Sequence, residues 1–122
     1  MITLHALLVR RSDLTHQEFL DHWHGTHGPL IRDTPGLAQH LIAYTQHPLT
    51  ASASGLGLDG FDGITVQTFA DWDAFLAFAS GPDAHLMNDD MASFLDVEGL
   101  RVTLTEDPVA VVGPPTSGDS PP

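Results

Sequence analysis

The chain has 122 residues, of which 42% are hydrophobic, so it is long enough for one domain with a modest core. Its 16 acidic residues face four arginines and no lysine, and the net charge of −12 argues against nucleic acid or an anionic membrane as partner. The lack of lysine excludes Schiff-base chemistry, and the lack of cysteine excludes disulfides and a thiolate nucleophile. No apolar run approaches 18 residues and no basic leader begins the chain, so we expect a cytoplasmic protein.

The first part of the chain predicts a strand followed by a helix. Residues 2–9 are apolar and partly β-branched, which is typical of a strand buried on both faces. Thr15 is a good helix N-cap, and Glu18 completes a capping box three residues later. The Gly-Pro pair at 28–29 predicts that this helix ends or kinks there, with one further turn before Pro35.

The rest of the chain predicts three strands and two helices. Residues 37–46 favour a strand, although their alanine and leucine content leaves a helix open. Residues 48–60 are small, polar and glycine-rich, which predicts a flexible loop, a candidate lid over a pocket. The later predicted elements are a strand at 62–69, helices at 71–79 and 82–95, a strand at 100–112 with a potential break at Pro108, and a disordered tail at 113–122.

This order of elements is β-α-β-β-α-β, the order of the ferredoxin-like α+β fold. In that fold the helices cover one face of an antiparallel sheet, and we expect it to span residues 1–112 as one domain. The predicted strands are apolar on both faces, so the face without helices needs a cover as well. We therefore expect a homodimer in which a second subunit provides it.

Three histidines lie on the first predicted helix, and their spacing separates them. At about 100° of rotation per residue, His27 falls inside the apolar stripe of the helix, one turn after Trp23. His24 flanks the stripe, whereas His22 points away from it toward solvent. His27 is then either a core histidine bonded to a nearby carbonyl or a general acid or base at a cavity.

A metal site is a weaker interpretation of these histidines, and we expect none. Only His24 and His27 share a helix face, so a third ligand would have to come from elsewhere, such as His5 or His40. The GLGLDG sequence at 55–60 lacks the strand-to-helix context of a dinucleotide site. The Gly-x-Ser-x-Gly motif of a nucleophile elbow is absent from the sequence.

Several motifs, taken in order, resemble those of the EthD-domain family. The segment Phe19-x3-Trp23-x3-His27-Gly-Pro, after a capped helix start, is similar to the signature of that family. Later segments also resemble family elements, namely Phe-Asp-Gly-Ile at 61–64, Asp-x3-Phe-x-Asp at 90–96 and Thr-Glu at 105–106. The resemblance spans residues 2–112.

The resemblance implies a dimeric α+β barrel with a pocket between sheet and helices in each subunit. Its members include decarboxylases and dehydratases of aromatic polyketides, lactone isomerases and proteins tied to ether degradation, and most characterised ones use no cofactor. The family's histidine corresponds to His27, with Trp23 beside it. The additional His22 and His24 and the long glycine-rich loop depart from the general pattern.

We therefore predict a cofactor-independent lyase, isomerase or cyclase acting on an aromatic, polyketide or lactone-like substrate in secondary metabolism or catabolism. His27 would transfer a proton at a carbon beside a carbonyl, and His40 and Tyr44 would orient or polarise the substrate. The residues expected to bind the substrate are Trp23, His24, His5, Ile42 and Phe69.

Two alternatives stay open at this point. One is cofactor-free oxygenation of an aromatic polyketide on the same fold. The other is a small-molecule binding or stress-response protein without chemistry, because a pocket binds ligands whether or not it converts them. Haem is a weaker candidate, since few basic residues are present to pair with its propionates.

Overall fold

The computed structural model describes residues 1–113, so the predicted disordered tail lies, but for its first residue, outside the described part of the chain. The elements in chain order are β1 (Ile2–Leu8), α1 (His16–His22), the π-helical turn η1 (Trp23–His27), α2 (Gly28–Asp33), α3 (Pro35–Ala38), β2 (Ala43–Pro48), the 3₁₀ helix η2 (Ala51–Leu56), β3 (Gly63–Phe69), α4 (Trp72–Ser80), α5 (Ala84–Phe94) and β4 (Arg101–Thr105). None of these helices is long and apolar enough to cross a membrane.

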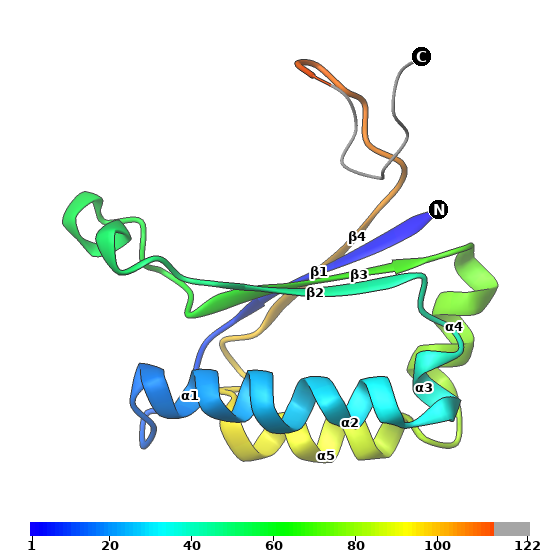
Figure 1. Ribbon diagram of the computed structural model, residues 1–122, viewed down its shortest axis with the longest axis horizontal. Helices are drawn as coiled ribbons and strands as arrows, with labels where there is room; N and C mark the ends of the chain where they lie inside the picture. Colours follow the sequence, from blue (N-terminus) through cyan, green and yellow to red (C-terminus); the bar gives the residue numbers. More distant parts are fainter. Residues whose placement is uncertain (114–122) are drawn as a thin grey trace.

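The four strands form one antiparallel sheet in the order β2-β3-β1-β4. All the larger helices lie on one side of this sheet, with α1, α2 and α5 running side by side beneath it (Figure 1). The predicted ferredoxin-like fold is therefore confirmed. The opposite face of the sheet carries no helix from residues 1–113, as Figure 1 shows.

Alternation along the strands decides which side chains face the helices. On β3, Thr65, Gln67 and Phe69 are buried against the helices, and Ile64, just before Thr65, is exposed on the other face. On β1, the helix-facing Ala6 and Leu8 are buried, whereas the alternate residues on the open face are only half-buried. The prediction that β1 is buried on both faces thus holds, within a single chain, only for the face that packs against the helices.

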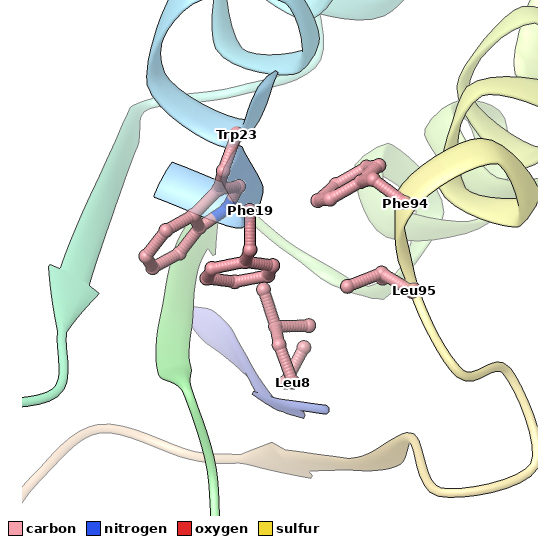
Figure 2. Packing of buried hydrophobic residues seen from close by; sticks show 6 residues of the cluster. Leu8, Phe19, Trp23, Phe94 and Leu95 are labelled. Atoms are coloured by element: carbon pink, nitrogen blue, oxygen red, sulfur yellow. The ribbon is translucent and has the colours of Figure 1, made fainter. Parts of the chain in front are cut away.

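The core between sheet and helices consists of two apolar clusters. In the first, the ring of Phe19 lies between those of Trp23 and Phe94, with centroids 5.2 Å and 5.8 Å from them. Leu8 of β1 and Leu95 pack beside them (Figure 2). The rings of Phe19, Trp23 and Phe94 are fully buried, so removing any one of them costs about 3–5 kcal/mol. The second cluster packs the other end of the sheet against α2, α3 and α4 around Ile31, Leu37, Phe69 and Phe78.

The first helix begins as predicted, and of the two outcomes expected at Pro29, an end or a kink, it does not end there but continues to Asp33. Thr15 Oγ1 accepts from the Glu18 N–H at 3.1 Å, and Glu18 Oε1 accepts from the Thr15 N–H at 2.9 Å, which forms the capping box. Instead of stopping, the helix widens into the π turn η1, where the Gly28 N–H donates to the Trp23 carbonyl five residues earlier. This turn relieves the clash that the Pro29 ring would make with a carbonyl four residues before it in an α-helix.

Two predicted strand boundaries are wrong. Residues 35–38 form the short helix α3, with Pro35 at its start, and β2 begins only at Ala43 rather than at residue 37. This is the helical alternative that the composition had left open, and it buries Leu37 almost completely. At the other end, β4 stops at Thr105 rather than at residue 112; Thr105 pairs with Thr3, so only Ile2 of β1 lies beyond it as a partner.

The glycine-rich segment 48–60 contains a 3₁₀ helix and projects from the end of the sheet (Figure 1). Gly57 ends that helix with φ of 69°, a left-handed conformation that glycine adopts without strain. The segment lies away from the cavity described below and contributes no residue to its lining. Its predicted role as a lid therefore has no support in this conformation.

Candidate active site

A cavity of about 160 Å³ lies between the sheet and the helices. Most of its wall is apolar and comes from β1, α4 and α5. Five polar or amphipathic side chains interrupt this wall, two from η1 and three from β2 and β3: Trp23, His27, Tyr44, Thr65 and Gln67. A small number of polar groups converging in an apolar cavity is the usual composition of a small-molecule site.

His27 is buried, with 5% of its surface exposed, and its Nδ1 lies 2.7 Å from Asp90 Oδ2. Its ring packs against Phe94 with centroids 5.0 Å apart. Burial lowers the pKa of His27 below 6.5, and the hydrogen bond and charge of Asp90 oppose that change without reversing it. The imidazole is therefore neutral at pH 7.

The carboxylate of Asp90 selects the tautomer of His27. A carboxylate accepts hydrogen bonds, so the ring proton of His27 is expected on Nδ1, where it donates to Oδ2. The lone pair is then on Nε2, the ring nitrogen that Asp90 does not engage. Since His27 lines the cavity, this nitrogen is the candidate basic atom of the site.

His22 binds the other oxygen of the same carboxylate. Its Nε2 lies 2.9 Å from Asp90 Oδ1, and its ring stacks on Phe94 at 4.6 Å. The prediction that His22 points to solvent is wrong. In an α-helix, residues five apart are rotated by about 140°, but in the π turn they lie about one turn apart, so His22 and His27 share a face.

Asp90 is the candidate functional residue that sequence reasoning missed. It lies on α5, one turn before Phe94, and 16% of its side chain is exposed. Phe94 is fully buried against the first helix, so the residue four positions earlier faces the same way. The Asp-x3-Phe spacing at 90–94 was visible in the sequence, but nothing in the sequence linked it to the histidines.

Tyr44 contributes a phenol from β2. Its Oη accepts a hydrogen bond from Gln46 Nε2 at 2.8 Å. Burial raises the pKa of Tyr44, and nearby polar groups of Gln46, Thr65 and Trp23 only partly oppose this rise; of the three, Gln46 alone meets hydrogen-bond geometry. The phenol is therefore protonated at neutral pH and keeps its own proton to donate.

Gln46 joins β2 to the π turn. Its Nε2 also donates to the Trp23 carbonyl at 2.9 Å, and its Oε1 lies 2.5 Å from His24 Nδ1. These contacts fix Tyr44 relative to η1. Gln46 could not be selected from the sequence, because an alternating strand does not reveal which helix backbone it will meet.

The indole of Trp23 is fully buried, and its Nε1–H has no partner in the described part of the chain. Trp23 fits there because Gly63 lies against it: a Cβ on Gly63 would be 2.6 Å from the indole ring. This close approach explains the glycine in the Phe-Asp-Gly-Ile motif. A buried donor without a partner, in the wall of a cavity, is a candidate ligand contact.

A second, more open depression of about 520 Å³ adjoins the cavity at Tyr44, which lines both. Its wall is formed by α2, β2 and the segment before β2. Among the residues that line it are His24, Arg32, Leu41 and Ile42. We refer to the two spaces as the inner cavity and the outer groove.

The structure brings together five of the eight predicted site residues. His27, Tyr44 and Trp23 line the inner cavity, and His24 and Ile42 line the outer groove. The other three lie elsewhere. His5 is on the open face of the sheet, bonded to Thr105; His40 is in the turn after α3, beside Gln39; and Phe69 is packed inside the second core cluster.

Side-chain direction explains these three positions. The inner cavity is lined from β1 by Leu4 and Ala6, so His5 between them must point to the opposite face. His40 was expected to share a face with Tyr44, but the strand that would have aligned them begins only at Ala43. Among residues 1–113, no group of three or more potential ligands is arranged to hold a metal ion.

Comparison with known proteins identifies the family. The EthD domain family matches residues 11–98. The structure is similar to that of an EthD family protein from Bacillus halodurans, with a TM-score of 0.68, 22% identity, and coverage of 88% of this chain and 98% of that one. No curated protein matches the sequence significantly.

Two further solved structures share the fold at lower identity. A dimeric ferredoxin-like protein of unknown function from Thermobifida fusca has a TM-score of 0.62 and 17% identity, covering 85% of this chain and 88% of that one. SnoaB, a cofactor-independent oxygenase from Streptomyces nogalater, has a TM-score of 0.62 and 10% identity, covering 90% of this chain and 95% of that one. Because the family match covers well over half of the residues, the chain belongs to the EthD domain family.

Proposed function

We propose that the chain is a cofactor-independent enzyme of the lyase, isomerase or cyclase type, in which His27 moves a proton at a carbon beside a carbonyl. The observation that carries this proposal is the buried pair of His27 and Asp90 at the wall of an apolar cavity. Membership of the family fits such a role without defining the reaction.

His27 Nε2 acts as the general base. It removes a proton from the substrate carbon, and the electron pair of the broken C–H bond moves to the carbonyl oxygen to give an enolate. The resulting imidazolium donates from Nδ1 to Asp90, which stabilises its charge. The same nitrogen then returns the proton to another carbon or to a leaving hydroxyl, so no cofactor is consumed.

Tyr44 stabilises the developing enolate oxygen. Its phenol proton is retained at neutral pH, and its own acceptor site is already occupied by Gln46, which leaves its O–H to donate into the cavity. The buried N–H of Trp23 is a second candidate donor to the same oxygen. Donors fixed in an apolar site are among the largest contributions to catalysis.

The volume of the inner cavity limits the substrate. A cavity of about 150 Å³ in another protein binds benzene, so 160 Å³ accommodates one six-membered ring. We therefore propose that the reacting part of the substrate is a single oxygenated ring, aromatic or lactone-like. Any remaining part of a larger polyketide would extend past Tyr44 into the outer groove, where Leu41 and Ile42 offer apolar contacts.

Solvent deuterium incorporation tests this function without knowledge of the product. One-ring β-keto lactones and cyclic β-diketones are incubated with the protein in D₂O, and exchange at the carbon beside the carbonyl is followed by NMR. We expect the wild-type protein to accelerate exchange and His27→Gln to abolish the acceleration. Equal exchange rates for the two proteins across the panel would contradict the proposal.

Cofactor-independent oxygenation is the second candidate, favoured by the structural likeness to SnoaB and by the buried, unpartnered Trp23 indole within the described residues. Oxygen uptake with electron-rich one-ring phenols, without added metal or flavin, separates it from proton transfer. Binding of these compounds without exchange or oxygen uptake would instead point to a binding protein.

We also propose that the protein is a homodimer through the open face of the sheet. That face carries Leu7, Ile64 and Val66 close to the centre of the sheet, according to the strand register. Structural neighbours of this fold are dimeric. Light scattering coupled to size-exclusion chromatography should give twice the 13.1 kDa mass of the chain, and Ile64→Arg should reduce it to one chain.

A further inference from the structure

The carboxylate of Asp90 is held from both sides. Oδ2 lies 2.7 Å from His27 Nδ1, and Oδ1 lies 2.9 Å from His22 Nε2. Among the described residues, no arginine pairs with this carboxylate. Its nitrogen partners are the imidazole rings of these two histidines. His27 faces the inner cavity, whereas neither His22 nor Asp90 contributes to the lining of that cavity.

We propose that His22 is a positioning residue, which fixes the orientation of the Asp90 carboxylate so that Oδ2 is presented to His27. The terminal torsion of an aspartate side chain is broad, so one hydrogen bond leaves the plane of the carboxylate poorly defined. Donors on two different oxygens define that plane. His22 thereby acts on the reacting atom only through Asp90, and its kinetic consequence rests on the function proposed above.

Ser93 does not replace His22 as the donor to Oδ1. The Ser93 hydroxyl lies 3.4 Å from Oδ1, but it has one proton, and the Asp90 backbone carbonyl accepts it at 2.5 Å. The nitrogen of His22 is at the shorter distance of 2.9 Å. Its ring is also stacked on Phe94, with an interplanar angle of 28°, so the donor is fixed in direction.

The π turn makes this arrangement available. His22 is the last residue of α1 and His27 the last of η1, and in a regular helix their side chains would diverge by about 140°. With the wider turn both rings reach the same carboxylate and pack against Phe94. His22 is partly open to solvent, with 29% of its side chain exposed, whereas His27 has 7%.

Two variants separate the hydrogen bond from the packing of the ring. His22→Phe keeps an aromatic ring on Phe94 but has no donor, and His22→Gln keeps an N–H donor but has no ring. The matched control is His85→Gln, because His85 lies near the start of α5, the helix that carries Asp90, and bonds the Pro82 carbonyl instead. All variants are compared at about pH 8, where a histidine of ordinary pKa is neutral.

The first readout is the tautomer of His27, measured from its ¹⁵N imidazole shifts. We expect the Nδ1–H form to dominate in the wild type, in His22→Gln and in His85→Gln, and to lose population to the Nε2–H form in His22→Phe. The second readout is the rate of substrate deuterium exchange. One lost hydrogen bond to a charged group predicts a roughly tenfold or greater loss of kcat for His22→Phe, with KM unchanged.

Each result for the His22 variants supports or contradicts the proposal. An unchanged tautomer and kcat in His22→Phe would overturn the proposal and leave His22 as a packing residue. Equal defects in His22→Phe and His22→Gln would also overturn it, because the donor would then not matter. A changed tautomer in a protein that exchanges no substrate would support the positioning role while refuting the proposed function.

Discussion

Asp62 and Asp90 are both bonded to histidines, but only Asp62 is also paired with an arginine. Asp62, directly before β3, accepts from the Arg10 backbone N–H at 2.9 Å, from the Arg10 guanidinium at 3.0 Å and from His16 at 3.0 Å. Asp90, on α5, is bonded by His22 and His27 alone among the described ring and guanidinium nitrogens. One carboxylate has a permanent cation and the other has not.

The difference separates a structural cluster from a chemical one. Burial alone would raise the pKa of Asp62, but the hydrogen bonds from Arg10 and His16 outweigh it and hold that pKa below 3.8. Asp62 therefore stays charged and fastens the end of β1 to the start of β3. Both clusters contain an imidazole, but His27 lines the inner cavity and His16 does not, so the proposed proton transfer belongs to the Asp90 cluster.

The largest expected difference in turnover is between variants in which one histidine of each cluster is replaced by glutamine. His27→Gln should reduce turnover about 10³-fold, the range lost with a general base. His16→Gln, on the same helical segment, should leave turnover unchanged, because His16 does not line the inner cavity. Steady-state kinetics measure both turnover rates. A comparable loss of turnover in both variants would show that the two clusters do not differ in function.

Exchanging the carboxylates for amides gives the next largest effect. In Asp90→Asn the amide can donate to His27 and select the opposite tautomer, with the proton on Nε2 and no base toward the cavity. We expect kcat to fall about 10²-fold with little change in KM. Asp62→Asn serves as the control for kcat, and an equally inactive Asp62 variant would show that the loss is not specific to the base.

The same pair of variants should show the reverse order in stability. Asp62→Asn leaves the Arg10 guanidinium without its charged partner, which should cost about 2 kcal/mol of unfolding free energy. Within residues 1–113 the Asp90 carboxylate is held by two imidazoles and no guanidinium, so its replacement should cost less. Urea denaturation at neutral pH gives both values, and a more destabilised Asp90→Asn would contradict the structural assignment of Asp62.

The pH dependence provides the smallest but most diagnostic difference. His27 must be neutral to act as a base, and burial lowers its pKa, so kcat/KM should fall only below pH 6.5 as the protein is acidified. Asp62 has a folded pKa below its unfolded value of 3.8, so the stability it contributes is present above 3.8 and is lost as pH falls further. As the pH is lowered, activity should therefore disappear while the protein is still folded. Loss of activity and unfolding at the same pH would contradict this prediction.

Much of the fold could be predicted because its signals are local. The capping box at Thr15 and Glu18, the cap at Asp71 and the alternation of β3 each depend on residues within one turn or strand. The errors arose where a local signal had two solutions. Residues 37–46 were compatible with strand and helix, and burial of Leu37 in the cluster around Phe69 decided in favour of α3.

The candidate site could be predicted only in part, for a geometric reason. His27 and Trp23 lie on one helix, so helical rotation was enough to select them. Asp90 is 63 residues away from His27, and only the packing of α5 against the first helix brings them together. The prediction for His22 was wrong because a rotation of about 100° per residue holds only in an α-helix, whereas the chain has a π turn at residues 23–27.

That turn also bears on how the helix tolerates changes in length. A deletion inside an α-helix normally shifts every later residue out of phase. Here the turn already contains one residue more than an α-helical turn would need, and Gly25 within it is exposed, with no atom within 4 Å of the position its Cβ would take. Removing Gly25 and replacing Pro29 with alanine would place His22 and His27 four positions apart, which an α-helix keeps on one face. The helix can therefore absorb the loss of this one residue, and a shortened chain with histidines at that spacing would present the same pair of rings.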